Sequence, residues 1–191
     1  MNSIVLHGTL KNIREPYIIN NKEFSKADLY FDNKNFIELR FRTNQNIYKE
    51  NDIIDIIGNL RTLSTLDENN KYHVLVYVFT HFDKPQINSE NTDVTLTGTI
   101  CKINRLESTQ RGSNYCNLIL ANNISTSSTR LSSYIPCISW GSIAKEISKY
   151  SVGTKLKVQG KINCRNYIKK ENLLQALELI INNYEVIEDD I

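Results

Sequence analysis

YIPCISWG, at residues 134–141, is the stretch from which the fold of this chain can be argued. Read as a β-strand, it places the rings of Tyr134 and Trp140 six residues apart. Side chains alternate between the two faces of a strand, so an even spacing puts both rings on the same face. The stretch therefore predicts a strand that presents two aromatic rings together.

A second long strand, residues 155–169, carries cations on one of its faces. Its alternate residues from Leu156 to Cys164 are apolar or glycine and indicate a core-facing side. The opposite parity is polar, basic and aromatic: Lys155, Lys157, Gln159, Lys161, Asn163, Arg165, Tyr167 and Lys169. Aromatic rings interleaved with Lys and Arg are typical of surfaces that bind single-stranded nucleic acid, because every base offers a π-face and every linkage a negative charge.

The two halves of the chain share one order of short strand patterns. The matched stretches are residues 4–10 with 94–100, 28–33 with 117–122, 36–42 with 134–140, 53–58 with 155–160, and 72–82 with 173–186. Five such patterns per half, separated by Gly, Asn and Ser turn signals, are typical of a small β-barrel. The repeat therefore predicts an all-β fold of two tandem five-stranded barrels.

The repeat also sets the expected domain limits. We expect an N-terminal barrel over residues 1–85 and a C-terminal barrel over residues 92–188, with a polar join between them. A short helix is predicted at residues 142–150, between the third and fourth strands of the second barrel. The equivalent residues 43–51 show little helical pattern. Residues 171–181 are rich in helix formers, but the repeat favours a strand there.

Composition argues against several functional classes. No apolar run approaches the roughly 18 residues of a membrane span, and the apolar start at Ile4 is interrupted by His7, unlike a secretory signal. The four cysteines form no Cys-x-x-Cys pair, and no carboxylate cluster or pair of nucleophile and base stands out. We therefore expect a soluble cytoplasmic protein with no membrane partner, which is not an enzyme and holds neither a metal nor a cofactor.

The net charge of +2 hides an uneven distribution. Residues 1–92 carry 11 Lys and Arg against 12 Asp and Glu, whereas residues 93–191 carry 12 against 9. Counted only to Tyr184, the second half has 12 against 5, because acidic residues gather at its end. A basic body suits a polyanionic partner, although any single Lys can equally belong to a solvated face.

The second half, residues 93–188, resembles the bacterial single-stranded DNA-binding protein family, whose oligonucleotide/oligosaccharide-binding (OB) barrels share this order of motifs. The motifs that carry the resemblance are LTGT at 96–99, YIPCISWG at 134–141, the helix after it, VQGKI at 158–162 and RNY at 165–167. It implies two tandem OB folds in which Tyr134, Trp140 and Tyr167 stack bases. A further family aromatic, expected near Thr126, is absent, and a hydroxyl-rich loop with Arg130 takes its place.

The resemblance and the cationic strand together predict a site and a function. The predicted nucleic-acid-binding residues are Tyr134, Trp140, Tyr167, Lys155, Lys157, Lys161, Arg165, Arg130, Arg111 and Lys169. The function implied is binding of single-stranded DNA without sequence specificity, in DNA replication, recombination or repair. Tandem-barrel relatives pair, which implies a homodimer, and the acidic end at residues 188–191 is similar in charge to the family tail that recruits replication and repair proteins.

The first half departs from this pattern. Where the second half has Lys155, Lys157 and Gln159, the aligned residues are Ile53, Asp55 and Ile57, which predicts a scaffold or dimerisation surface. Weaker nucleic-acid contacts are predicted on the third strand: Phe36, Arg40 and Arg42. The alternative function is a protein-interaction scaffold of a replication or mobile-element complex, with weak or no DNA binding. The sequence leaves DNA and RNA equally open as ligands.

Overall fold

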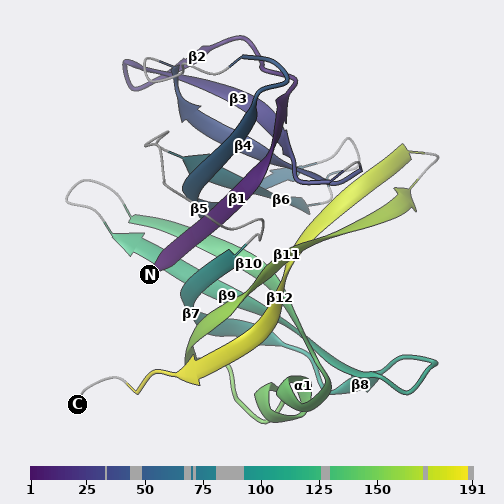
Figure 1. Cartoon of the computed structure of the whole chain (residues 1–191). Coiled ribbons are helices and arrows are strands. Elements are labelled where there is room, and N and C mark those ends of the chain that lie inside the picture. The colour runs from purple at the N-terminus through teal and green to yellow at the C-terminus, as the bar shows by residue number, and fades with distance from the viewer. Residues whose placement is uncertain are drawn as a thin grey trace. The chain divides into compact units, whose positions relative to one another are not determined.

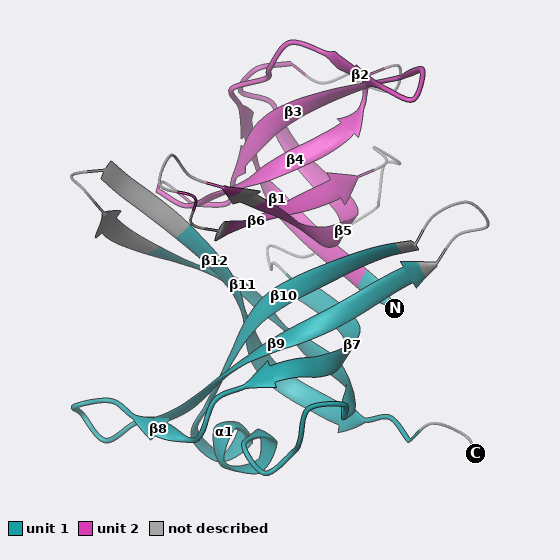
Figure 2. Cartoon of the chain, turned by 180° about the vertical axis from the view of Figure 1, so that it is seen from behind, with its two compact units in different colours: residues 1–2, 93–191 teal, residues 3–92 magenta. Residues whose placement is uncertain are grey.

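The computed structural model describes residues 1–32, 34–43, 49–66, 70, 72–80, 93–125, 130–169 and 172–188. Side chains are not described at residues 65, 72, 125, 130, 166–169 and 172–175. The chain divides into two compact units, residues 3–92 and residues 1–2 with 93–191 (Figure 2). Both units are built almost entirely from strands (Figure 1), which confirms the predicted all-β fold.

The N-terminal unit is a closed barrel of five strands with a short extra one. The strands are β1 (Asn2–Lys11), β2 (Tyr17–Ile19), β3 (Lys22–Tyr30), β4 (Phe36–Arg42), β5 (Ile53–Leu66) and β6 (Tyr72–Thr80). Their order is β2-β3-β4-β6-β5-β1, and antiparallel pairing of β1 with β3 closes the barrel. The β4–β6 pair is parallel, and the other pairs are antiparallel.

The core of this barrel follows from alternation along each strand. In β4, Ile37, Leu39 and Phe41 are fully buried, whereas the residues between them are partly exposed. Gly8 lies where β1 crosses β3, and a Cβ atom there would collide with the carbonyl oxygen of Tyr30. The Gly8 position therefore depends on the missing side chain, which lets two backbones approach as the barrel closes.

The C-terminal unit repeats this connectivity. Its elements are β7 (Asp93–Ile103), β8 (Glu107–Ser108), β9 (Asn114–Ser125), β10 (Arg130–Trp140), α1 (Gly141–Ile147), β11 (Lys155–Lys169) and β12 (Asn172–Val186). The order is β7-β11-β12-β10-β9-β8, with pairing of β7 and β9 closing the barrel. The β10–β12 pair is parallel, as is the matching β4–β6 pair of the first unit. The repeat read from the sequence is thus a structural repeat.

Helix α1 is shorter than predicted from the sequence. It begins at Gly141, where φ is +61°, and ends at Ile147 instead of Tyr150. It buries Ala144 and Ile147 and packs against β9, β10 and β12. Five of the equivalent residues in the first half, 44–48, lie outside the described part of the chain. No helix among the described residues has the length and apolar character needed to cross a membrane.

Strand β12 confirms that pairing overrides local propensity. Its 15 residues are strand, although many of them favour helices. It pairs antiparallel with β11 and, from Leu179 to Ile181, parallel with β10. The register of the β11–β12 pair shifts at Gln159 and Gly160, which is a β-bulge on the β12 side.

Candidate nucleic-acid interface

Tyr134 and Trp140 project from the outer face of β10, as the sequence predicts. Their exposed fractions are 50% and 40%, whereas Ser133, Ile135 and Cys137, on the other parity, are buried. Six residues of strand separate the two rings by roughly 20 Å. The two rings therefore lie at separate positions along one strand, and neither belongs to the barrel core.

Trp140 has an aromatic neighbour that the sequence reading missed. Tyr115 of β9 is its direct partner in the antiparallel register, and the two ring centroids lie 5.4 Å apart at 41°. The Tyr115 hydroxyl donates a 2.7 Å hydrogen bond to Oε2 of Glu107 on β8. This hydrogen bond is the main cause that raises the pKa of the Tyr115 phenol. The strand predicted at residues 117–122 did not include Tyr115. Pairing that strand with residues 134–140 and continuing the antiparallel register as far as Trp140 would have placed Tyr115 opposite Trp140.

Strand β11 shows the predicted division between a core face and a cationic face. Leu156, Val158 and Ile162 are buried, whereas Lys161 and Arg165 are exposed. Such a row of cations on an open face is suited to a phosphate backbone.

Acidic residues of the neighbouring strand β12 modify this cationic face. Nζ of Lys157 lies 3.5 Å from Oε2 of Glu185, its partner in the register. Nδ2 of Asn163 donates a 3.0 Å hydrogen bond to Oε1 of Glu178. The charge of Lys157 is therefore partly offset by a neighbouring carboxylate of the same unit, and the face is less uniformly basic than β11 alone suggests.

The remaining predicted residues lie around the edges of the unit. Arg111 is exposed in the turn that joins β8 to β9, where Gly112 has a φ of +79°. Figure 1 shows that β8 lies beside α1, whereas the β11–β12 hairpin extends away from α1. Tyr167 and Lys169 lie on that hairpin, and Arg130 begins β10; the side chains of these three residues lie outside the description. The structure thus brings Arg111 to the end of the unit that holds α1, and Tyr167 to a different region.

In the N-terminal unit, the predicted contact residues Phe36, Arg40 and Arg42 share the outer face of β4. Phe36 and Arg40 are already engaged, whereas Nε of Arg42 is buried with no hydrogen-bond partner among the described residues. Nε of Arg40 donates a 2.7 Å hydrogen bond to Oε1 of Glu38, and its guanidinium lies 4.0 Å from the Tyr77 ring centroid. Only 14% of the Arg40 side chain is exposed. Phe36 stacks on Tyr30 with centroids 5.1 Å apart. Arg40 therefore packs against neighbouring side chains of this face, and little of it is open to a ligand.

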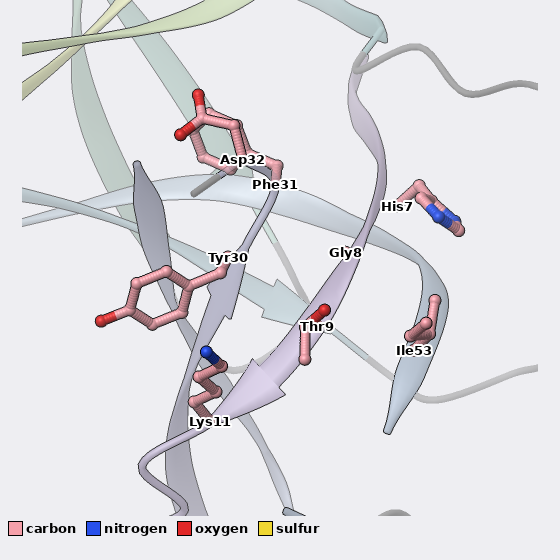
Figure 3. Close-up of a pocket in the computed structure, with 8 residues that line it drawn as sticks. All are labelled: His7, Gly8, Thr9, Lys11, Tyr30, Phe31, Asp32 and Ile53. Carbon is pink, nitrogen blue, oxygen red and sulfur yellow. The ribbon is translucent and has the colours of Figure 1, made fainter. Parts of the chain in front are cut away.

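A pocket of about 280 Å³ lies on the β1 side of the N-terminal unit (Figure 3). Lys11 lies over the Tyr30 ring there, at 5.1 Å from the centroid. His7, which also lines the pocket, lies 2.7 Å from Oδ1 of Asp55. Beside this pair, Ile53 and Ile57 are 71% and 45% exposed. The β1–β5 face thus combines polar side chains that contact one another with open apolar side chains.

Among the residues that the structure describes, few groups could serve chemistry other than binding. Within the described ranges, no group of three or more His, Cys, Asp or Glu residues could hold a metal ion. Cys116 and Cys137 are buried, and burial raises the pKa of the Cys137 thiol far above its ordinary value. Such a thiol is unsuited to act as a nucleophile.

These features define a class: a tandem OB-fold protein whose second barrel carries open aromatic and cationic side chains. The family model described as "Single-strand binding protein family" matches residues 91–187, and the chain belongs to this family. Its name states that its members bind single strands. This agrees with the resemblance read from the motifs at residues 96–99, 134–141 and 158–162.

Solved structures agree with the fold over the whole chain. Wild-type single-stranded DNA binding protein from Thermus aquaticus matches with a TM-score of 0.68 and 17% identity, covering 100% of this chain and 95% of that chain. A deletion mutant of the same protein matches with a TM-score of 0.73 and 17% identity, covering 100% and 96%. At this identity the likeness shows the fold. Comparison with curated protein sequences gave no match.

Proposed function

We propose that the chain binds single-stranded DNA without sequence specificity. Bases stack on Tyr134 and Trp140, and Lys155, Lys161 and Arg165 neutralise phosphates along β11. The observation that carries this proposal is the exposure of both rings, 50% and 40%, on the outer face of a strand whose other face is core. Arg111, Arg130, Lys157, Tyr167 and Lys169 would extend the same path.

The expected strength of binding follows from these contacts. Each stacked base contributes about 1–3 kcal/mol, and the contribution does not depend on which base it is. Each neutralised phosphate steepens the fall of affinity with salt, with a slope of roughly 0.7 per contact on single strands. A duplex offers neither open base faces nor accessible base edges to this site, so it should bind poorly.

We place this activity in DNA replication, recombination or repair in the cytoplasm, with the chain acting as a homodimer. The N-terminal barrel is proposed as the scaffold or dimerisation unit, because Ile53 and Ile57 are open on its outer face while His7 and Asp55 beside them contact each other. Recruitment of replication or repair proteins through the acidic end at residues 188–191 rests on the resemblance alone. Residues 189–191 lie outside the described part of the chain.

The test is fluorescence anisotropy with a labelled oligo(dT), an RNA strand of equal length and a hairpin duplex. The expected result is tight binding of oligo(dT) that weakens steeply between about 50 and 200 mM salt, and weak binding of the duplex. Equal affinity for single strands and duplex would contradict the proposal. The RNA arm decides between the two ligands that the residues leave open.

A second candidate function is favoured by the N-terminal unit. Its exposed isoleucines, and Arg40 with its guanidinium already bound to Glu38, suit contact with protein better than contact with phosphate. In this reading the chain is an assembly scaffold of a replication or mobile-element complex. A chain that binds no strand at low salt and forms a dimer in sedimentation measurements would favour the scaffold.

A further inference from the structure

Three side chains form a row on the outer face of the C-terminal unit. The strand register pairs Glu107 of β8 with Tyr115 of β9, and Tyr115 with Trp140 of β10. Residues paired across strands project from the same face of a sheet and contact one another. The contacts here are the 2.7 Å hydrogen bond from Tyr115 to Glu107 and the 5.4 Å separation of the Tyr115 and Trp140 rings. The row therefore runs from a carboxylate through a phenol to an indole.

We propose that Tyr115 is a further base-stacking residue, and that Glu107 positions Tyr115 and biases the site toward bases that carry an amino group. This inference rests on the proposed binding of single strands. It deepens that proposal, because it names the base composition that the same barrel favours.

The geometry of the two rings supports stacking on both. At an interplanar angle of 41°, Tyr115 and Trp140 do not form one flat surface, and they present two adjoining facets. Tyr115 is half-buried and Trp140 is exposed, so neither ring is enclosed by the barrel. Every base has a π-face that can stack on such facets. A strand that places one base on the indole can thus place a neighbouring base on the phenol.

The hydrogen bond to Glu107 restrains the phenol. A half-buried tyrosine on the face of a sheet can rotate about its side-chain torsions, and the entropy of this rotation is lost when a base binds. Glu107 holds the hydroxyl end, and the Trp140 ring contacts the rest of the side chain. Glu107 is therefore a positioning residue for the stacking facet.

The carboxylate also has a chemical preference among bases. A carboxylate has about four lone-pair sites, so the bond from Tyr115 leaves capacity to accept another donor. Cytosine presents its N4 amino group as a donor, whereas thymine presents the O4 acceptor at the same place. A negative group repels phosphates, so a role in neutralising the backbone does not fit Glu107. At this facet the site should prefer cytosine over thymine.

The experiment measures the affinity of the full chain for labelled oligo(dC) and oligo(dT) of equal length. Tyr115→Leu removes the ring, Tyr115→Phe keeps the ring and removes its tether, and Glu107→Gln keeps an acceptor and removes the charge. Glu146→Gln is the matched control, because Glu146 accepts a 2.8 Å hydrogen bond from Tyr184 in the same unit and the charge change is identical.

We expect Tyr115→Leu to weaken both affinities about tenfold, the size of one lost stacking contact. Glu107→Gln should lower the ratio of oligo(dC) to oligo(dT) affinity by roughly threefold, and Glu146→Gln should leave this ratio unchanged. Tyr115→Phe should lose less affinity than Tyr115→Leu.

Two results would overturn the inference. One is wild-type affinity in a folded Tyr115→Leu variant, and the other is a ratio that stays constant in Glu107→Gln or moves equally in Glu146→Gln. If Tyr115→Leu fails to fold in circular dichroism, Tyr115→Phe and Glu107→Gln still decide the question. If the unaltered chain binds neither oligonucleotide, the proposed function itself fails, and this is a distinct outcome from binding without an effect of Tyr115 or Glu107.

Discussion

Lys157 on β11 lies opposite Glu185 on β12, with Nζ 3.5 Å from Oε2. Both side chains are well exposed, so the pair is screened by solvent and adds little to the stability of the barrel. Its consequence for binding is larger, because a lysine beside a carboxylate attracts a phosphate less strongly. The β11–β12 pairing therefore limits the affinity of the proposed site.

Removing this carboxylate should strengthen binding. We expect Glu185→Gln to raise the affinity for oligo(dT) and to steepen the salt dependence by up to about 0.7 in log–log slope, the contribution of one phosphate contact. Glu178→Gln, which removes the same charge from β12 beside an amide, is the control and should have a smaller effect. Isothermal titration at several salt concentrations measures both. An identical response of the two variants would show that Lys157 makes no contact with phosphate.

The exposed rings of β10 should matter for binding and not for folding. The double variant Tyr134→Ala, Trp140→Ala should lose about 2–6 kcal/mol of binding free energy if each ring stacks one base. Its thermal unfolding should stay within a few degrees of the unaltered chain, because both rings are half open to solvent. Anisotropy and differential scanning calorimetry check the two parts. A collapse of the melting temperature would identify the rings as core residues.

Arg40 should show the opposite behaviour. Arg40→Ala removes a charge-assisted hydrogen bond to Glu38 and the contact with the Tyr77 ring, so it should destabilise the N-terminal barrel by about 1–3 kcal/mol. Arg165→Ala, on the exposed face of β11, should weaken DNA binding with little change in stability. Urea unfolding and anisotropy of both variants separate these effects. Strong loss of binding in a stable Arg40→Ala variant would show that the first barrel contacts DNA directly.

The close pairing of β11 with β12 depends on Gly160. A Cβ atom there would collide with the carbonyl oxygen of Ile180, at the β-bulge between β11 and β12. We expect Gly160→Ala to lower the free energy of unfolding by about 1–3 kcal/mol or more, because the Ile180 backbone cannot move aside without breaking the hydrogen bonds between β11 and β12. Gly112→Asn, in an open turn with a φ of +79° that asparagine tolerates, is the control. Equal melting temperatures for the two variants would contradict this account.

The buried thiol of Cys137 should make stability depend on pH. Burial raises its pKa in the folded state, so the folded barrel keeps the thiol neutral while the unfolded chain ionises near about 8.5. This contribution to stability is complete below that pH and is lost as the pH rises further. We expect Cys137→Ala to flatten the alkaline loss of stability, measured by urea unfolding from about pH 7 to 10. Exposed Cys101 should react with a thiol reagent in the native state, and Cys137 only after unfolding.

The strands that bury one face were predictable because burial repeats every second residue. Residues 36–42 and 134–140 were expected as strands, and they lie in β4 and β10. The short strands β2 and β8 were not predicted, because their residues are largely exposed and only their hairpin partners hold them. The helix ends earlier than predicted because its buried residues are Ala144 and Ile147. Tyr150, which was expected inside the helix, instead contacts Tyr184 beyond the helix end.

The sequence predicts which face of a strand each residue of the candidate site occupies, but it does not predict which side chains contact one another across strands. Parity alone separated Leu156 and Val158 from the lysines of β11. Which acid faces Lys157 depends on the β12 bulge, where the register skips Asn182, and no pattern in the sequence shows this. The Arg40–Tyr77 contact joins β4 to β6, two strands that are distant along the chain. Tyr115 was missed because the apolar pattern of β9 begins after it.

Titration of the single tryptophan tests the central proposal most directly, because Trp140 is the only indole in the chain and lies on the proposed binding face. Addition of oligo(dT) at low ionic strength should quench its fluorescence, the quench should reverse as salt is raised, and a duplex should have little effect. A flat titration with oligo(dT) at low ionic strength would contradict the account.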